Sequence, residues 1–272
     1  MADEGMERKG MEQSIGRAAT PNQADVQIEL EQQRRLGEAD AYLSWLFRNL
    51  EGHIGQRVLD VGCAIGNLTQ FLLCDEAGTP RERVVGIDVA PEMIDEIRRR
   101  FGHRDNFDAR VCDITQPEAL ALRDEALDTI VCAHVLEHVY DDVAALRHMR
   151  ALLPEGGTLI LLVPVVKSIW GRLDEATGHQ RRYAWRELEA LLVQLGFAID
   201  DHWYVNLLAI PGWFFTGRIL RREIIPTGQY SLYNKITPIL ARLETWLRPP
   251  IGLSVACICR VAPDAAGEER HG

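Results

Sequence analysis

The segment VLDVGCAIGNL, residues 58–68, contains the turn that decides how the chain folds and what it binds. An apolar run reaches Asp60 and then a glycine-rich turn with Gly62 and Gly66, followed by a helical pattern. A strand, a glycine turn and a helix in this order present backbone N–H groups to a ligand at the start of the helix. The dinucleotide fingerprint G-x-G-x-x-G needs its last glycine one residue later, where this chain has Asn67. The spacing therefore predicts a ligand without a pyrophosphate.

Short apolar runs and helical patterns alternate through the rest of the chain. The runs predicted as strands are 57–61, 83–89, 107–112, 127–133, 157–164, 197–205 and 252–262. The helical patterns are 66–73, 91–101, 117–123, 141–153 and 184–195. This alternation is typical of βαβ units, whose helices cover both faces of a parallel sheet. We therefore expect an α/β fold: a doubly wound, mostly parallel sheet of seven strands with helices on both faces.

Further segments complete the predicted organisation. Residues 23–50 have a helical pattern and are expected to form N-terminal cap helices. Residues 206–251, rich in apolar and aromatic side chains, are expected to form a helical cap insertion before the last strand. Residues 1–22 and 263–272 lack apolar periodicity, so we expect two disordered tails. The chain between them, 23–262, is interpreted as a single domain.

Composition restricts the partners and the compartment. The 272 residues carry a formal net charge of −10, which disfavours a nucleic-acid partner because such a partner requires a broad basic surface. No apolar run reaches the roughly 18–20 residues that span a bilayer, so no transmembrane segment is expected. The six cysteines have neither zinc-ligand nor C-x-x-C spacing. We therefore expect reduced thiols, no metal and a cytoplasmic location.

The ordered acids and glycines resemble those of the class I S-adenosylmethionine (SAM) methyltransferases. The first motif of that family, (D/E)-x-G-x-G-x-G, matches the run from Asp60 to Gly66, with Ala64 at the middle glycine. Asp88 ends the second predicted strand, where the family's acid accepts hydrogen bonds from both ribose hydroxyls. The triplet LEH, residues 136–138, follows the fourth predicted strand as it does in many members.

The resemblance implies SAM as the cofactor and S-adenosylhomocysteine (SAH) as its product. Asp113 and Ile114 end the third predicted strand, where the family contacts adenine. The cofactor-binding residues that the resemblance implies are Asp60, Gly62, Cys63, Ala64, Gly66, Asn67, Asp88, Val89, Met93, Cys112, Asp113, Ile114, His134 and Val135.

Four more stretches are similar to a bacterial branch of these methyltransferases. They are DD at 141–142, GHQRRY at 178–183, GW at 212–213 and GLSV at 252–255. With them, the resemblance extends from about residue 40 to residue 262. It supports the type of reaction more than the identity of the acceptor.

Candidates for the acceptor side of the site follow the fourth and fifth predicted strands. His134 comes where the family places groups near the methionine moiety or the acceptor, and we interpret it as a base or as a polar contact to SAM. The GHQRRY run combines arginines with an aromatic residue and a histidine, a set that can grip an anionic acceptor. The catalytic candidates are His134, His179 and Tyr183. The substrate-binding candidates are His138, His179, Arg182, Tyr183 and Trp213.

Structural alternatives exist for several of these residues. Arg182 can form a salt bridge with Asp174 or Glu175, and His138 can buttress the following helix. The aromatic residues of the insertion, Trp213 among them, can form the core of a helical cap instead of an acceptor pocket. The arginine run 98–100 is assigned to a solvated helix face without functional weight.

The expected function is SAM-dependent methyl transfer to a small-molecule acceptor, an O- or N-nucleophile or a carboxylate, by a monomer or homodimer. An NAD(P)-dependent oxidoreductase is the first alternative. A non-catalytic SAM-binding subunit that dimerises through residues 206–251 is the second. Contact of that insertion with a membrane surface, through its aromatic and arginine side chains, is a less favoured addition.

Overall fold

The computed structural model of the chain describes residues 30–31, 33–34, 36–37, 40–221, 237, 242–244 and 246–263. The predicted N-terminal tail, nearly all of the predicted C-terminal tail and much of the predicted cap insertion lie outside these residues.

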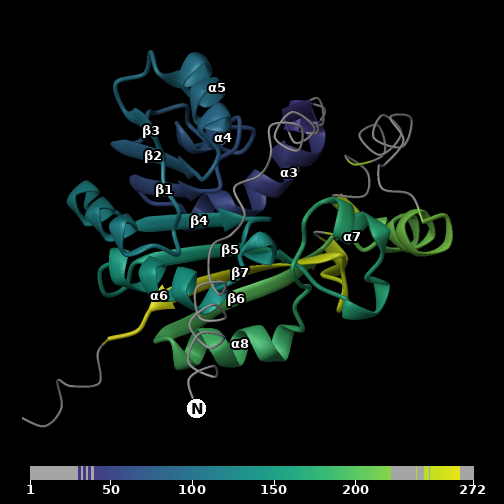
Figure 1. The fold of residues 1–272 in the computed structure, drawn as a ribbon. Coiled ribbons are helices and arrows are strands. Elements are labelled where there is room, and N and C mark those ends of the chain that lie inside the picture. The colour runs from purple at the N-terminus through teal and green to yellow at the C-terminus, as the bar shows by residue number, and fades with distance from the viewer. Residues whose placement is uncertain are drawn as a thin grey trace, which may run out of the picture.

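Seven strands form one sheet in the order β3-β2-β1-β4-β5-β7-β6 (Figure 1). Their bounds are β1 Arg57–Val61, β2 Arg83–Asp88, β3 Phe107–Val111, β4 Thr129–Ala133, β5 Thr158–Pro164, β6 Phe197–Val205 and β7 Ser254–Val261. The strands from β3 to β5 pair in parallel, whereas β7 is antiparallel to both β5 and β6. The predicted seven-stranded, mostly parallel sheet is confirmed, with β7 as its one reversed strand.

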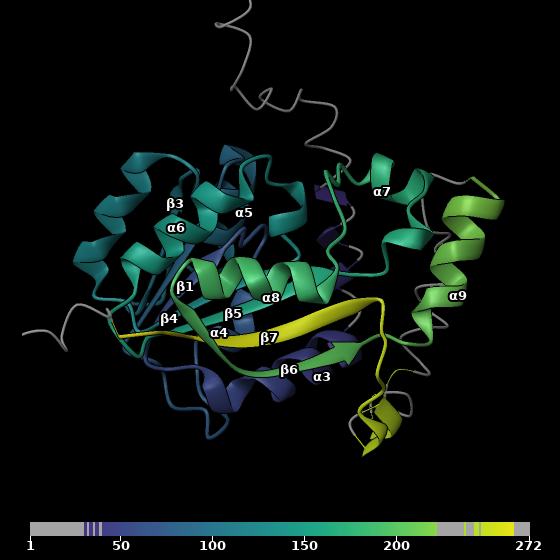
Figure 2. The ribbon, with the colours of Figure 1, turned by 90° about the horizontal axis from the view of Figure 1, so that it is seen from below.

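Helices cover both faces of this sheet (Figures 1 and 2). The apolar cluster on one face includes side chains of α3 Asp40–Leu50, α4 Thr69–Leu72 and α5 Pro91–Phe101. The cluster on the other face includes side chains of the 3-10 helix η2 Pro117–Glu125, α6 Asp142–Leu152 and α8 Trp185–Gln194. The interior strand β5 is buried at every position, because helices pack on both faces of the sheet.

The helix that follows β1 is shorter than its pattern predicts. The helical pattern runs over 66–73, but α4 begins at Thr69. Gly66 has a φ of +84°, so the glycine turn is still in a left-handed conformation where the pattern places the start of the helix. By contrast, α5 has its predicted bounds, because Pro91 needs no hydrogen-bond acceptor in the first turn.

Several short elements lie beyond the C-terminal ends of β5 and β6 (Figure 2). They are η3 Leu136–His138, η4 Lys167–Ile169, α7 Arg172–Ala176, α9 Ala209–Trp213 and the π-helix η5 Phe214–Ile219. The backbones of α7 and η5 are in contact, since a Cβ on Gly171 would lie 3.0 Å from the carbonyl carbon of Gly217.

The two predicted caps are described in part. The described residues of 30–37 are helical and precede α3. Of the predicted insertion 206–251, residues 209–219, 237, 242–244 and 246–247 are helical, and the remaining helical prediction lies largely outside the described residues. No helix in the described part of the chain is both long and apolar enough to cross a bilayer.

Candidate active site

The glycine turn connects β1 to α4 at the C-terminal edge of the sheet. Gly62 and Gly66 have φ values of +68° and +84°, and Ala64 between them has +45°. A Cβ on Gly62 would lie 2.3 Å from Cγ2 of Val135, so only glycine lets the turn approach the segment after β4. The N–H of Gly62 donates to the carbonyl of Ile87 at 2.8 Å, which ties the turn to β2.

Two carboxylates border this turn. Asp88, at the end of β2, accepts hydrogen bonds from the N–H groups of Ala64 at 3.0 Å and Ala90 at 2.9 Å. Asp60 is buried in β1 and accepts a 2.6 Å hydrogen bond from the hydroxyl of Thr69. The pKa of Asp60 is raised to about 7, mainly by burial and to a smaller extent by the nearby Asp88, although the hydrogen bond from Thr69 lowers it. Paired acids favour a cationic ligand that carries hydroxyl donors.

The residues after β2 and β3 continue this site. Val89 follows Asp88 and exposes 57% of its surface, which leaves an apolar side chain free beside the carboxylate. Asp113 accepts hydrogen bonds from the N–H and the hydroxyl of Thr115, at 2.9 and 2.7 Å. Ile114 is buried, and burial raises the pKa of the half-buried Cys112 thiol. These surroundings fit a nucleoside whose base lies between apolar side chains.

Two predicted cofactor ligands face the N-terminal segment instead. The side-chain N–H of Asn67 donates to the carbonyl of Gln33 at 2.7 Å. Met93 is buried in a small apolar cluster with Leu30 and Ile65. The described part of the N-terminal segment therefore packs over the glycine turn, and the Asn67 amide is engaged in holding it there.

A histidine and a glutamate form a pair where β4 ends. His134 has a φ of +56°, and its N–H donates to the carbonyl of Leu162 at 2.8 Å. Its Nδ1 lies 3.2 Å from Oε1 of Glu137, whose side chain is fully buried, while the His134 side chain is 40% exposed. Burial alone raises the pKa of Glu137, but the neighbouring His134 and His138 hold it below its usual range. Glu137 is therefore a carboxylate, and the His134 side chain remains partly exposed.

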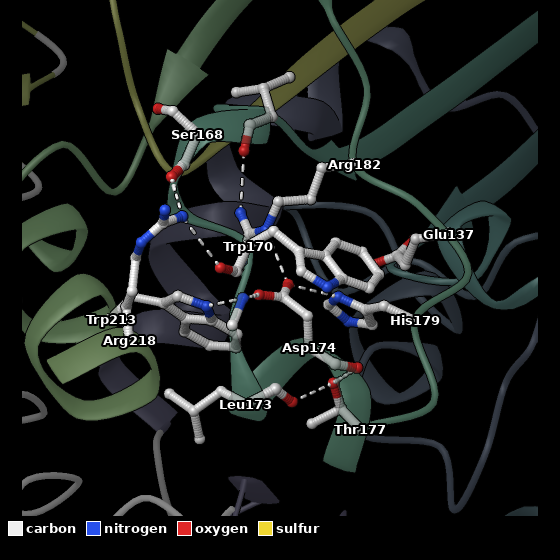
Figure 3. A network of polar contacts seen from close by, with 12 residues as sticks. Glu137, Ser168, Trp170, Leu173, Asp174, Thr177, His179, Arg182, Trp213 and Arg218 are labelled. Atoms are coloured by element: carbon white, nitrogen blue, oxygen red, sulfur yellow. Dashed lines mark hydrogen bonds and ion pairs between the residues drawn. The ribbon is translucent and has the colours of Figure 1, made fainter. Parts of the chain in front are cut away.

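A second carboxylate, Asp174 in α7, lies at the centre of a polar network (Figure 3). It accepts hydrogen bonds from Nε of Arg182 at 2.7 Å, Nδ1 of His179 at 3.0 Å and Nε1 of Trp213 at 3.3 Å. The N–H of Gly171 adds a fourth, at 3.0 Å. Burial raises the pKa of Asp174, but these donors outweigh it and lower the pKa below its usual range. Asp174 thus joins the loop after β5 to the first helix of the insertion.

The structure corrects the predicted role of Arg182 and gives Tyr183 a partner within the protein. Arg182 is buried and donates to Asp174 and to the carbonyl of Val165, so the salt-bridge alternative is confirmed and its guanidinium is not free for an acceptor. The Tyr183 hydroxyl is also buried and donates to Asp142 at 2.8 Å. Burial and the Asp142 carboxylate raise the pKa of Tyr183. The Tyr183 hydroxyl is thus engaged within the protein, and its predicted catalytic role stays a prediction.

Two residues that organise the site were not singled out in the sequence. Glu137 is the acid of the LEH triplet. The sequence signal that could have identified it is an acid within an otherwise apolar run, because a buried acid requires a partner. Arg100, assigned to a solvated face, instead donates to the carbonyl of Ile65 in the glycine turn. No sequence signal shows this contact, because helix periodicity does not tell which loop lies next to a helix face.

The strand order, the glycine turn and the acids at successive strand ends define an α/β protein that binds a nucleoside cofactor. Residues 59–159 match the family model described as a methyltransferase domain. This part of the chain is therefore similar to a SAM-dependent methyltransferase domain, and the comparisons support SAM as its cofactor.

Several known proteins are similar to parts of this chain. A protein from Streptomyces fradiae, described as an uncharacterized 37.1 kDa protein in transposon TN4556, is 29% identical over 62% of this chain and 51% of its own length. The ubiquinone biosynthesis O-methyltransferase of Xanthomonas campestris is 35% identical over 39% of this chain and 42% of that protein. The structure of the trans-methyltransferase CalH in complex with SAH has a TM-score of 0.53 at 22% identity, covering 84% of this chain and 59% of that one. The chain thus spans about half or less of the curated relatives it matches.

Removing the charge of Asp60 is expected to stabilise the ligand-free protein at alkaline pH. Because its folded pKa of about 7 lies above the ordinary 3.8, the stability contributed by its proton is lost as the pH rises through about 7. A shift of about three pKa units is worth about 4 kcal/mol at most. We expect Asp60→Asn to raise the free energy of unfolding by roughly 1–4 kcal/mol at pH 8, with little difference near pH 4.

Urea unfolding of both proteins at the two pH values measures this effect. The matched control is Asp124→Asn, since Asp124 is exposed in η2 and its substitution should leave stability unchanged at both. An equal gain at acid and alkaline pH would contradict the assignment of the effect to the Asp60 charge.

Proposed function

We propose that the chain transfers the methyl group of SAM to an oxygen or nitrogen atom of a small molecule, with His134 as the general base. The observation that supports this proposal is the His134–Glu137 pair at the end of β4. The next residue, Val135, packs against the glycine turn, so the pair lies at the turn's border.

The acids of the turn are proposed to hold the cofactor. Asp88 has carboxylate lone pairs left after its two backbone hydrogen bonds, and these suit the ribose hydroxyls. Asp60 supplies negative potential to a ligand that carries positive charge. Val89 and Ile114 supply apolar surface for the base. When bound, SAM provides an electrophilic methyl carbon on a positively charged sulfur, so the protein's task is to position the acceptor and exclude water.

His134 is proposed to take the acceptor's proton through Nε2. Its Nδ1 is engaged by Glu137, which holds the ring orientation and stabilises the imidazolium that forms. The left-handed backbone and the hydrogen bond to Leu162 hold the residue at the strand end. A positioned base is useful for a hydroxyl or a protonated amine but not for a carboxylate, which needs no deprotonation. The pair therefore favours an O- or N-nucleophile over a carboxylate acceptor.

The similarity to a protein named ubiquinone biosynthesis O-methyltransferase supports an oxygen acceptor. The oxidoreductase alternative is not favoured, because Asn67 stands where the dinucleotide turn has its last glycine and residues 59–159 match a methyltransferase model. The non-catalytic alternative does not account for a buried glutamate that orients a partly exposed histidine.

The test measures SAH formation from SAM with a panel of phenols, catechols, alcohols and amines, together with calorimetric SAH binding. We expect His134→Asn to lower kcat by about 10²–10⁴-fold while SAH binding stays unchanged. The exposed His103 provides the control variant, His103→Asn, which should behave as the wild type. Equal turnover by the wild type and His134→Asn would refute the base, and turnover only of carboxylates would refute the acceptor class.

A further inference from the structure

Three side chains of metal-ligating type meet beside the proposed base. Glu137 and His138 belong to η3 after β4, and His179 follows α7 after β5. One candidate ligand atom from each of the three lies within 4.8 Å of the other two. The sequence predicts no metal, because the ligands come from two loops that the fold brings together and have no short spacing along the chain.

One oxygen of the Glu137 carboxylate is buried without a hydrogen-bond partner. Oε1 contacts Nδ1 of His134, but Oε2 is buried and has no hydrogen-bond partner. The nearest buried cation, Arg182, directs its donors to Asp174 and to the carbonyl of Val165. A buried carboxylate oxygen without a donor is costly, so the site favours a cationic ligand at Oε2.

Both histidines are held as metal ligands usually are. Nδ1 of His179 contacts Asp174 at 3.0 Å, which leaves Nε2 of that ring as the free ligand atom. The His138 ring meets the His179 ring edge to face, with centroids 4.9 Å apart, and is hydrogen-bonded to the backbone of Gly178. A carboxylate behind a histidine is the usual support of a metal-bound imidazole, because it sets the tautomer and the ring orientation.

We propose that Glu137, His138 and His179 bind a divalent transition-metal ion, with Zn²⁺ as the reference ion. Two imidazoles and one carboxylate suit Zn²⁺, Co²⁺ or Fe²⁺ and disfavour Mg²⁺ and Ca²⁺, which prefer oxygen ligands. Bond lengths of about 2.0–2.2 Å place ligand atoms about 3–3.5 Å apart, so the three side chains close slightly around the ion. Positions not filled by protein remain open to water or to an acceptor oxygen.

The ion would have a use in catalysis as a Lewis acid. An acceptor oxygen bound to it becomes more acidic and is placed beside His134, which contacts the same glutamate. An acceptor that chelates through two adjacent oxygens would be preferred over a simple alcohol. This catalytic use rests on the proposed function, whereas the binding of the ion does not.

The experiment titrates the 272-residue chain, freed of metal by chelator, with Co²⁺ while its visible absorption is recorded, and then displaces Co²⁺ with Zn²⁺. We expect one Co²⁺ per chain, a ligand-field band more intense than that of aqueous Co²⁺, and a dissociation constant for Zn²⁺ in the micromolar range or below. Glu137→Gln, His138→Ala and His179→Ala should each weaken Zn²⁺ binding at least 100-fold. Asp174→Asn should weaken it about 10–100-fold.

A surface variant, a measurement of folding and two site variants serve as controls for this test. The surface variant His103→Ala should bind Co²⁺ and Zn²⁺ as the wild type does, and SAH binding in every sample reports whether the variant is folded. His138 is partly exposed, so His138→Ala tests the site even if His179→Ala does not fold. His134→Asn should keep the metal even where it loses turnover, which separates this inference from the proposed base. Absence of the Co²⁺ band, or equal Zn²⁺ affinity in folded wild type and His138→Ala, would overturn the metal site.

Discussion

Replacing Asp88 by asparagine is expected to weaken the binding of SAM and SAH by at least about 100-fold, or about 2.7 kcal/mol. The carboxylate accepts the N–H groups of Ala64 and Ala90, and an asparagine amide can offer only one oxygen to these two donors. The turn then loses part of its support at the same time as the ribose loses a charged acceptor. Hydrogen bonds to charged groups contribute about 1.5–3 kcal/mol each. The loss of one such bond in the turn and of one to the ribose therefore accounts for the expected change in affinity.

The expected loss is one of affinity and not of folding. Burial raises the pKa of Asp88, so removal of its charge relieves a desolvation cost in the ligand-free protein. Calorimetry with SAH measures the affinity, and thermal unfolding without ligand measures the stability. Asp124→Asn, with its exposed carboxylate, should match the wild type in both. If Asp88→Asn bound SAH with wild-type affinity, the proposed arrangement of the cofactor would be wrong.

Replacing Arg182 by methionine is expected to cost about 3–5 kcal/mol of stability near neutral pH. The guanidinium and the Asp174 carboxylate are both buried, so the change leaves a buried charge without its main partner. The carbonyl of Val165 loses its donor as well. Arg182→Lys should recover only part of the loss, because a lysine cannot donate to both acceptors with the planar geometry of arginine.

The pH dependence identifies the cause of this loss. The wild-type Asp174 has a lowered pKa, so its contribution to stability is present above pH 3.8 and is lost only as the pH falls through the lower folded value. In the variant, only His179, Trp213 and Gly171 still donate to Asp174, so less of the burial cost is compensated and protonation of Asp174 relieves more of it. The stability difference between wild type and Arg182→Met should therefore shrink as the pH is lowered toward 4–5.

Denaturant unfolding at several pH values tests both the loss of stability in Arg182→Met and its decrease at low pH. The control is Arg172→Met, on the same short helix, because Arg172 forms an exposed ion pair with Glu175. Exposed pairs contribute at most about 1 kcal/mol, so this control should change stability little. A loss for Arg182→Met no greater than that of the control would show that the Asp174 network does not hold this part of the fold.

Local patterns were sufficient to predict the seven strands and the helices α5, α6 and α8. The strands were visible as apolar runs bounded by turn residues, and α5 was visible because Pro91 marks its start and Ile94 and Ile97 share its buried face. The pattern at 117–123 was less informative, since those residues form a 3-10 helix in place of an α-helix. Spacing also argued against the dinucleotide turn, because the last glycine comes one residue too early.

The acceptor side of the site could be predicted only as a list of candidates. Arg182 and Tyr183 have the chemistry of binding residues, but both side chains are buried against acids of the protein itself. Glu137 had no assigned role, although it contacts the proposed base. Residue type tells what a side chain can do, but not whether its partners belong to a ligand or to the same chain.

The sequence by itself determined the sheet, the glycine turn and the acids at the strand ends, because these features depend on periodicity and on spacing over a few residues. Only the tertiary structure decided that Asp174 would bind Arg182, His179 and Trp213, and that His179 would lie beside His138. Such contacts join segments that are far apart along the chain, and their geometry follows from how the loops after β4 and β5 pack together. That packing depends on the whole sheet and its helices and leaves no local pattern in the sequence.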